Sequence, residues 1–165
     1  MCIRDSHCVE CLPEYFKDQV VTFIIPATPC YQKKPQRVGR SGLGLAFNGV
    51  AFDAPAPLHL ILGGYTIPPL DPAGGHINMD VGYHYHAATG LSAELKQADG
   101  HAPLLGYAMD GIGLYAYKNA DGTIPNDLDE CRGHFDEVRG YHYHVDATGN
   151  NNFINCFSGA IATNE

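Results

Sequence analysis

The sequence predicts an all-β or β-dominated α+β fold with two pseudo-repeated β units, hairpins, long glycine- and proline-rich loops and short helices. Three observations support this fold class. The 165 residues include 19 glycines and 11 prolines, which favour turns over long helices. Asn48-Gly49 and Asp110-Gly111 each separate two apolar segments, which is a strong signal for a two-residue hairpin turn. The third observation is an internal duplication.

Two cassettes carry the duplication. Leu-Asp-x-x-x-Gly-His, five further residues and Gly-Tyr-His-Tyr-His occupy residues 70–86 and recur at residues 128–144, an offset of 58. Upstream, residues 44–52 parallel residues 106–114, so each half has a glycine-turned apolar segment and then a histidine cassette. Two copies are too few for a solenoid, so we expect two units packed about a pseudo-twofold axis, with both GYHYH segments on adjacent central strands. The expected pseudo-repeats are residues 44–100 and 106–160.

The segments outside the cassettes are predicted from local composition. β-Branched residues and phenylalanine predict a strand at Gln19–Pro26, and the Pro, Lys, Arg and Gly content of residues 27–43 predicts a loop. Leu45–Phe52 and Tyr107–Tyr117 are the expected hairpins. A capping serine and a glycine beyond the last turn predict a short helix at Ser92–Ala98.

Length and composition predict one domain. A chain of 165 residues is in the single-domain range, and 45% hydrophobic residues argue against disorder. Residues 1–6 read Met-Cys-Ile-Arg-Asp-Ser, the translation of a common sequencing-library adapter, so we expect an artefact there. We expect residues 7–24 to be the remnant of a truncated N-terminal part that has lost its signal peptide. Residues 25–165 should form the single domain.

Charge and hydropathy restrict the partners. The net charge is −8 with neutral histidines, and the ten Lys and Arg residues are scattered along the chain. A basic stripe that neutralises phosphates is therefore missing, and nucleic acid is not an expected partner. Apolar runs stay far below the roughly 20 residues of a membrane-spanning helix, so we expect no membrane span.

The spacing of the histidines predicts metal ligands. Alternate residues of a β-strand share a face, so His84 and His86 point one way, about 6.6 Å apart along the strand, and the tyrosines point the other way. A turn at Gly74-Gly75 brings His76 back as a third ligand. Three neutral imidazoles suit zinc or copper, and three ligands with one open position are typical of catalytic zinc. The predicted ligands are His76, His84 and His86 in the first half and His134, His142 and His144 in the second.

Carboxylates and tyrosines are the expected neighbours of these ligands. Asp71 and Asp129 are candidates for outer carboxylates that orient the imidazoles. The cassettes also supply Tyr83, Tyr85, Tyr141 and Tyr143. An alternative arrangement merges the two sets across the pseudo-twofold axis into one site of His84, His86, His142 and His144.

Two further histidines have separate expectations. His101 precedes Ala102-Pro103, and we expect it to close a site across the halves. His59 lies in an apolar segment, where a core or edge-strand histidine is expected.

Three classes of function remain open. The first is a metal-binding module that holds zinc or copper, and the second is a metal-dependent hydrolase or copper oxidoreductase. The third is a structural or adhesive domain in which tyrosines pack and histidines bond to the backbone. Repetition favours a metal, because packing in one half does not require a third histidine at the same spacing in the other. Serine-hydrolase, nucleotide-binding and calcium-loop motifs are absent from the sequence.

The cysteines predict a disulfide in the second half. Cys131 lies inside the second cassette and Cys156 just beyond it, so they are the natural pair, and their bridge would contribute about 3 kcal/mol. An alternative role for Cys131 is a metal ligand beside His134. Cys8-x-x-Cys11 is either a redox or metal pair, or part of a disulfide network with Cys30.

The repeated motifs resemble one known family. The doubled GYHYH, LDECRGH at residues 128–134, LGYAMDG at 105–111 and NGVAF at 48–52 are similar to the YHYH-domain family over residues 25–160. That family consists mostly of secreted or surface proteins without an established activity. The resemblance therefore implies a fold and a secreted, periplasmic or cell-surface location, and it implies no reaction. It also implies cysteines where this chain has Ala73 and Leu91, so a first-half disulfide is lost here.

Overall fold

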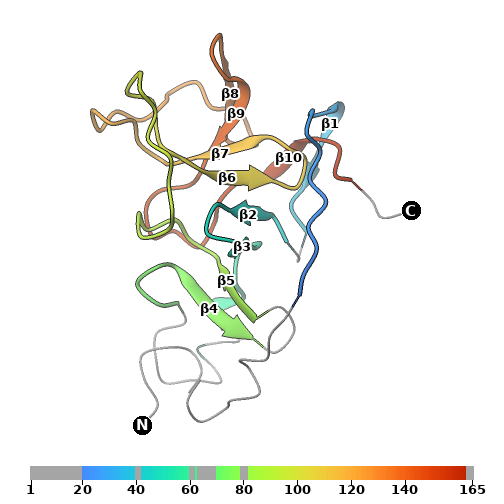
Figure 1. The fold of residues 1–165 in the computed structure, drawn as a ribbon, viewed down its shortest axis with the longest axis vertical. Helices are drawn as coiled ribbons and strands as arrows, with labels where there is room; N and C mark the ends of the chain where they lie inside the picture. Colours follow the sequence, from blue (N-terminus) through green and yellow to red (C-terminus); the bar gives the residue numbers. More distant parts are fainter. Residues whose placement is uncertain (1–19, 40–41, 60–61, 63–69, 79–81, 163–165) are drawn as a thin grey trace.

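The computed structural model describes residues 20–39, 42–59, 62, 70–78 and 82–162 (Figure 1). In this part of the chain, ten strands form an open eight-stranded sheet and a two-stranded sheet, with almost no helix. The predicted β-dominated class is confirmed. The strands are β1 (Tyr31–Arg37), β2 (Gly44–Ala46), β3 (Ala51–Phe52), β4 (Gly75–Asn78), β5 (Gly82–Tyr85), β6 (Leu104–Ala108), β7 (Gly113–Tyr115), β8 (Gly133–Asp136), β9 (Gly140–His144) and β10 (Cys156–Gly159).

The larger sheet reproduces the duplication of the sequence. Its order is β4-β5-β3-β2-β6-β7-β9-β8, which is symmetric about the β2–β6 pair. In each half two antiparallel hairpins join through a parallel pair, β3 with β5 and β7 with β9. The two pseudo-repeated β units are thus confirmed. The expectation of adjacent GYHYH strands is wrong, because the hairpins β2–β3 and β6–β7 lie between β5 and β9.

Glycines allow the central strands to meet. Gly44 pairs with Ala108, and Gly106 pairs with Ala46, one on each side of the Leu45–Tyr107 pair. A Cβ atom on either glycine would collide with the backbone of the opposite strand. The pseudo-twofold axis therefore passes through a seam that only glycine permits.

The predicted hairpin turns are present in both halves. Gly49 and Gly111 have φ angles of 81° and 83°, a region that glycine enters without steric cost. Asn48 and Asp110 accept hydrogen bonds from the backbone two residues later, at Val50 and Ile112. Their side chains also reach the cassettes: the Asn48 amide donates to the Tyr85 hydroxyl, and Asp110 accepts from the Tyr143 hydroxyl.

The hydrophobic core lies under the central strands and the segment that leads to β10. Phe52, Leu114 and Tyr143 are almost fully buried, and the Phe52 ring packs at 4.7 Å from the Phe153 ring. Burial of one such side chain is worth about 1.5–3 kcal/mol. The second tyrosine of each cassette faces this core, so the histidines beside it point to the other side of the strand.

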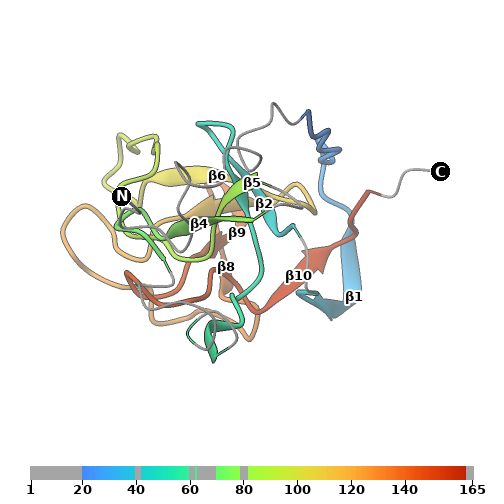
Figure 2. The same ribbon diagram turned by 90° about the horizontal axis from the view of Figure 1, so that it is seen from below.

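The small sheet corrects the prediction for the N-terminal part. Residues 27–43 were predicted as a loop, but they contain β1, which pairs antiparallel with β10 (Figure 2). Residues 20–26 are not in a strand, and Val20 is exposed. Apolar composition does not make a strand without a partner, and β10 pairs with the more polar segment instead.

Two local predictions are also wrong. Ser92–Ala98 forms no helix; Leu95 instead makes an isolated bridge with Leu104. A seven-residue helix has little stability of its own, so the tertiary pairing prevails. Leu58 and His59 are helical rather than extended, and His59 is exposed, consistent with Pro57 at the start of a helical turn.

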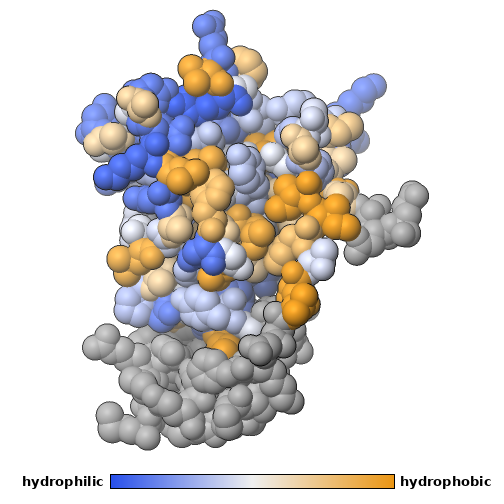
Figure 3. Space-filling model, in the orientation of Figure 1, coloured by the Kyte–Doolittle hydropathy of each residue, from blue (hydrophilic) through white to orange (hydrophobic). Residues whose placement is uncertain are grey.

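On the side shown in Figure 3, apolar residues lie in patches across the middle of the molecule, and hydrophilic residues gather toward the upper left. No helix in the described ranges has the length and apolar character required to cross a membrane.

Candidate functional site: two histidine clusters

The first cluster is built by one hairpin. β4 and β5 are antiparallel, and His76 lies directly opposite His84. His86 follows His84 on the same face. The Nε2 atom of His76 lies 3.1 Å from Nε2 of His84 and 3.0 Å from Nε2 of His86, and all three side chains are buried.

The second cluster repeats this arrangement and adds one residue. His134 on β8 lies opposite His142 on β9, and its Nε2 is 3.0 Å from Nε2 of His142 and 3.2 Å from Nε2 of His144. His101, from the segment between the halves, places its Nε2 3.0 Å from that of His142. Within each cluster the ligand atoms all lie within 4.8 Å of one another.

The six predicted ligands therefore come together as two separate sets. The alternative of one merged site is wrong, because each cluster draws on its own hairpin. His101 joins the second cluster rather than closing a site across the halves. Its sequence neighbourhood contains no repeat of the cassette, so spacing alone could not assign it.

The Nδ1 atom of most rings points away from the cluster, and its hydrogen bond fixes the ring orientation and the nitrogen that carries the proton. Nδ1 of His84 donates to the Gly82 carbonyl, and Nδ1 of His86 donates to that of Ala54. The second cluster matches them: His142 donates to Gly140, His144 to Ala116 and His101 to Ala102. A carbonyl only accepts, so each Nδ1 carries the proton and each neutral ring directs the lone pair of Nε2 into the cluster.

Burial favours the neutral form of four of these rings. It lowers the pKa of His86 to about 4 and that of His142 to about 4, with neighbouring histidines adding to the effect. Burial likewise lowers the pKa of His144 to about 3 and displaces the pKa of His101 downward. Neutral imidazole is the form that binds metal ions.

Three carboxylates that the sequence did not reveal lie near the clusters. Asp127 accepts a 2.8 Å hydrogen bond from Nδ1 of His134, and this bond lowers the pKa of the carboxyl. Asp53 lies 4.0 Å from Nε2 of His84, and Asp136 lies 4.0 Å from Nε2 of His142. Burial raises the pKa of Asp53. The sequence signal for Asp127 was its position one residue before the second cassette. Asp53 follows β3, and only the pairing of β3 with β5 shows that it lies near the first cluster.

Asp71 and Asp129 have a different role from the one predicted. Oδ1 of Asp129 accepts hydrogen bonds from the amides of Cys131 and Gly133, and Oδ2 accepts one from the Tyr141 hydroxyl at 2.7 Å. Asp71 makes the same bonds to Ala73, Gly75 and Tyr83. The two carboxylates thus hold the turn before each hairpin and do not orient the imidazoles.

The tyrosine hydroxyls likewise support the scaffold. Tyr83 and Tyr141 donate to these turn carboxylates, while Tyr85 and Tyr143 bond to Asn48 and Asp110. The prediction that these tyrosines surround the metal ligands is therefore wrong, because their hydroxyls bond to the turns instead.

The last histidine of each cassette is held through its backbone. The amide of His86 donates to the Gly74 carbonyl, and that of His144 donates to the Arg132 carbonyl. Gly74 and Arg132 have positive φ angles of 86° and 70°. The Arg132 guanidinium donates to the carbonyls of His144 and Val145, which offsets the steric cost of a side chain in this conformation.

The disulfide lies in the core of the second half. Cys131 and Cys156 are bonded, with Cα atoms 4.7 Å apart, as predicted from the sequence. Cys131 is therefore not available as a metal ligand. Cys30 is a free, exposed thiol, and Cys8 and Cys11, like His7, lie outside the described residues.

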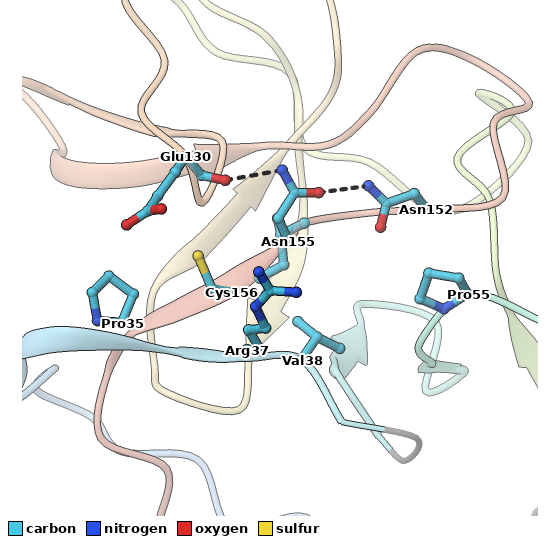
Figure 4. A pocket seen from close by; sticks show the side chains of 9 residues that line it. Pro35, Arg37, Val38, Pro55, Glu130, Asn152, Asn155 and Cys156 are labelled. Carbon is cyan, nitrogen blue, oxygen red and sulfur yellow. Dashed lines mark hydrogen bonds between the residues drawn. The ribbon is translucent and has the colours of Figure 1, made fainter.

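A pocket of about 520 Å³ lies beside β1 and the segment that leads into β10 (Figure 4). Its lining includes Arg37, Pro55 and Ile154. On one wall Asn155 donates to the Glu130 carbonyl and accepts from the Asn152 amide. The pocket is lined by no histidine, and we assign it no role.

Comparison with known families identifies the scaffold. The family model described as YHYH protein matches residues 22–127, which is more than half of the chain. The chain belongs to the YHYH protein family. The matched region contains the first cassette and His101 and ends just before the second cassette. Searches of curated proteins and of solved structures found no match to this YHYH protein.

Proposed function

We infer that this YHYH family member is a metal-binding domain that holds zinc or copper at two histidine sites. One observation carries the proposal. In each cluster, imidazole Nε2 atoms approach to 3.0–3.2 Å while the Nδ1 atoms of most rings donate outward to carbonyl groups.

The distances support a shared cation. Metal–nitrogen bonds of about 2.0–2.1 Å in tetrahedral geometry place two ligand nitrogens about 3.3 Å apart. The separations of 3.0–3.2 Å are close to that value. Neutral imidazoles are ligands for both zinc and copper.

A purely structural role explains the clusters less well. In the second cluster every ring donates outward from Nδ1, so the Nε2 lone pairs face one another at 3.0–3.2 Å and repel. The arrangement also occurs twice, on hairpins at opposite ends of the sheet. A bound cation removes this repulsion in the second cluster and fits the same close approach of Nε2 atoms in the first.

The disulfide supports an extracytoplasmic location. Bridges such as Cys131–Cys156 persist in oxidising compartments and are rare in the cytosol. We accordingly place the protein in a secreted, periplasmic or cell-surface compartment.

The test is metal stoichiometry in protein purified without a histidine tag. Elemental analysis, and calorimetry on chelator-treated protein at neutral pH, should give two zinc or copper ions per chain. The double variants His84→Ala/His86→Ala and His142→Ala/His144→Ala should each retain one ion. His59→Ala, which removes an exposed histidine, is the matched control and should retain two.

Absence of zinc and copper binding by folded protein at neutral pH would exclude this function. An intact disulfide and an unchanged circular dichroism spectrum show that a variant is folded.

A further inference from the structure

We propose that the two metal sites differ in coordination: four histidines close the second site, whereas the first site keeps one position for a small exogenous ligand, water or an anion, beside Asp53. This inference rests on the proposed metal-binding function. It assigns ligand exchange to the first site.

Strand register shows which residues correspond in the two halves. Phe52 on β3 pairs with Tyr85, and Leu114 on β7 pairs with Tyr143. The next residues, Asp53 and Tyr115, are therefore equivalent. At this equivalent position, the first half has a carboxylate beside its cluster and the second half has an aromatic ring beside its cluster.

The aromatic ring helps to complete the second site. The Tyr115 ring packs edge-on against His101 and His142, each with centroids 4.9 Å away. Arg139 links the loop of His101 to the β8–β9 hairpin through ion pairs with Asp99 and Asp136. His101 is thus held from two sides as a fourth imidazole.

The first cluster has no counterpart of this fourth imidazole among the described residues. The sequence offset of 62 between β3 and β7 places Gly39 at the position of His101. The first set contains only His76, His84 and His86 within ligand distance of one another. Three protein ligands leave a zinc ion one position for water or another small ligand, whereas four saturate a tetrahedral ion.

Asp53 is placed to contact that small ligand. Its Oδ1 accepts a hydrogen bond from the Ala54 amide, and its Oδ2 lies 4.0 Å from Nε2 of His84. Asp53 does not belong to the set of ligand atoms that lie within 4.8 Å of one another. It is therefore a neighbour of the first site that can accept a hydrogen bond from metal-bound water.

The test counts the sites that respond to an added anion. The metal-free protein is loaded with two equivalents of cobalt(II), whose visible absorption reports coordination, and is titrated with azide. In the unmodified chain, one cobalt of the two should respond. His101→Ala opens the second site, so both should respond, while His59→Ala should behave like the unmodified chain.

Asp53→Asn assigns the responding site. Removal of a negative charge beside the open position should raise azide affinity several-fold at one site and leave cobalt content unchanged. The same substitution should not affect the additional response created by His101→Ala.

The outcomes separate this inference from the proposed function. Failure to bind cobalt, zinc or copper would overturn both. Two bound cobalt ions with no azide response would show that another side chain completes the first site, and this would overturn the inference alone. An equal response of both ions in the unmodified chain, or no gain from His101→Ala, would also overturn it.

Discussion

Gly133 and its counterpart Gly75 show how closely each cassette is assembled around single residues. A Cβ atom on Gly133 would collide with the ring and hydroxyl of Tyr141, and one on Gly75 would contact the Tyr83 hydroxyl at 2.7 Å. The absence of a side chain lets each tyrosine lie across the strand and reach its turn aspartate. The glycine before each ligand histidine is therefore a steric requirement of the hairpin.

Gly133→Ala tests this requirement. The added methyl must displace Tyr141, which breaks its bond to Asp129 and moves the neighbouring His134. We expect a loss of about 1–3 kcal/mol in the free energy of unfolding, measured by urea denaturation, with weaker metal binding at the second site. Gly39→Ala is the control, because its Cβ meets nothing within 4 Å, and it should change stability by less than about 0.5 kcal/mol. Equal urea midpoints for the two variants would contradict the steric argument.

Residue-level predictions from the sequence succeeded where the information was local. Strand alternation placed His84 and His86 on one face, and repetition pointed to the same spacing in the second half. His101 and Asp53 could not be assigned in this way, because their neighbours belong to strands distant in the sequence. Asp129 was misassigned because its partners are two backbone amides and a tyrosine hydroxyl, which spacing does not reveal.

At the scale of elements, β10 is attached to the second half by several kinds of contact. The Cys131–Cys156 bridge joins it to the turn before β8. The Ser158 amide donates to the Tyr143 hydroxyl, and the Gly159 amide donates to the buried Asp110. β10 in turn pairs with β1, so the small sheet depends on these contacts.

Removal of the disulfide should therefore loosen the small sheet. The bridge closes a sequence separation of 25 residues, and cross-links of this size contribute about 3 kcal/mol by restricting the unfolded chain. Cys131→Ala/Cys156→Ala should lower the free energy of unfolding by about that amount, measured by urea denaturation, and should accelerate amide hydrogen exchange in β1 and β10. Cys30→Ala should leave both measurements unchanged. Full retention of stability in the double variant would show that the noncovalent contacts of β10 are sufficient.

Element predictions depended on whether a segment finds its partner nearby. The hairpins β2–β3 and β6–β7 follow from Asn-Gly and Asp-Gly turns, and both were predicted. β1 pairs with β10 across more than 100 residues, and its polar sequence gave no indication of a strand. Residues 20–26 have the composition of a strand but no strand pairing.

At the scale of the whole molecule, duplication gives one sheet with a histidine cluster toward each end. The halves share hairpins, turn aspartates and tyrosine anchors, but they differ around the clusters. The second half has the disulfide and Asp127, and its cluster gains His101 from the segment between the halves, whereas the first half has Ala73 at the position of Cys131. The repeated sequence predicts a symmetric strand order. It does not predict where β5 and β9 lie, because their positions depend on the parallel pairs β3–β5 and β7–β9.

The buried clusters should make the stability of the metal-free protein sensitive to mild acid. His86, His142 and His144 have folded-state pKa values of about 4, 4 and 3, below the value of about 6.5 expected in an unfolded chain. Between about pH 6.5 and pH 4 the unfolded chain therefore binds more protons, and the free energy of unfolding falls as the pH falls. Each ring contributes a slope of up to about 1.4 kcal/mol per pH unit in this window.

Urea denaturation of chelator-treated protein from pH 8 to pH 4 measures this dependence. Stability should be nearly constant above about pH 7 and should decline below about pH 6.5, before aspartates with lowered pKa values, such as Asp127, become protonated. His144→Asn removes one buried titrating ring and should reduce the slope, whereas His59→Ala, at an exposed position, should leave the slope unchanged. A flat profile between pH 6.5 and pH 4.5 would mean that the rings are already protonated or accessible in the folded state, and that the clusters are not the closed, neutral sets their outward hydrogen bonds indicate.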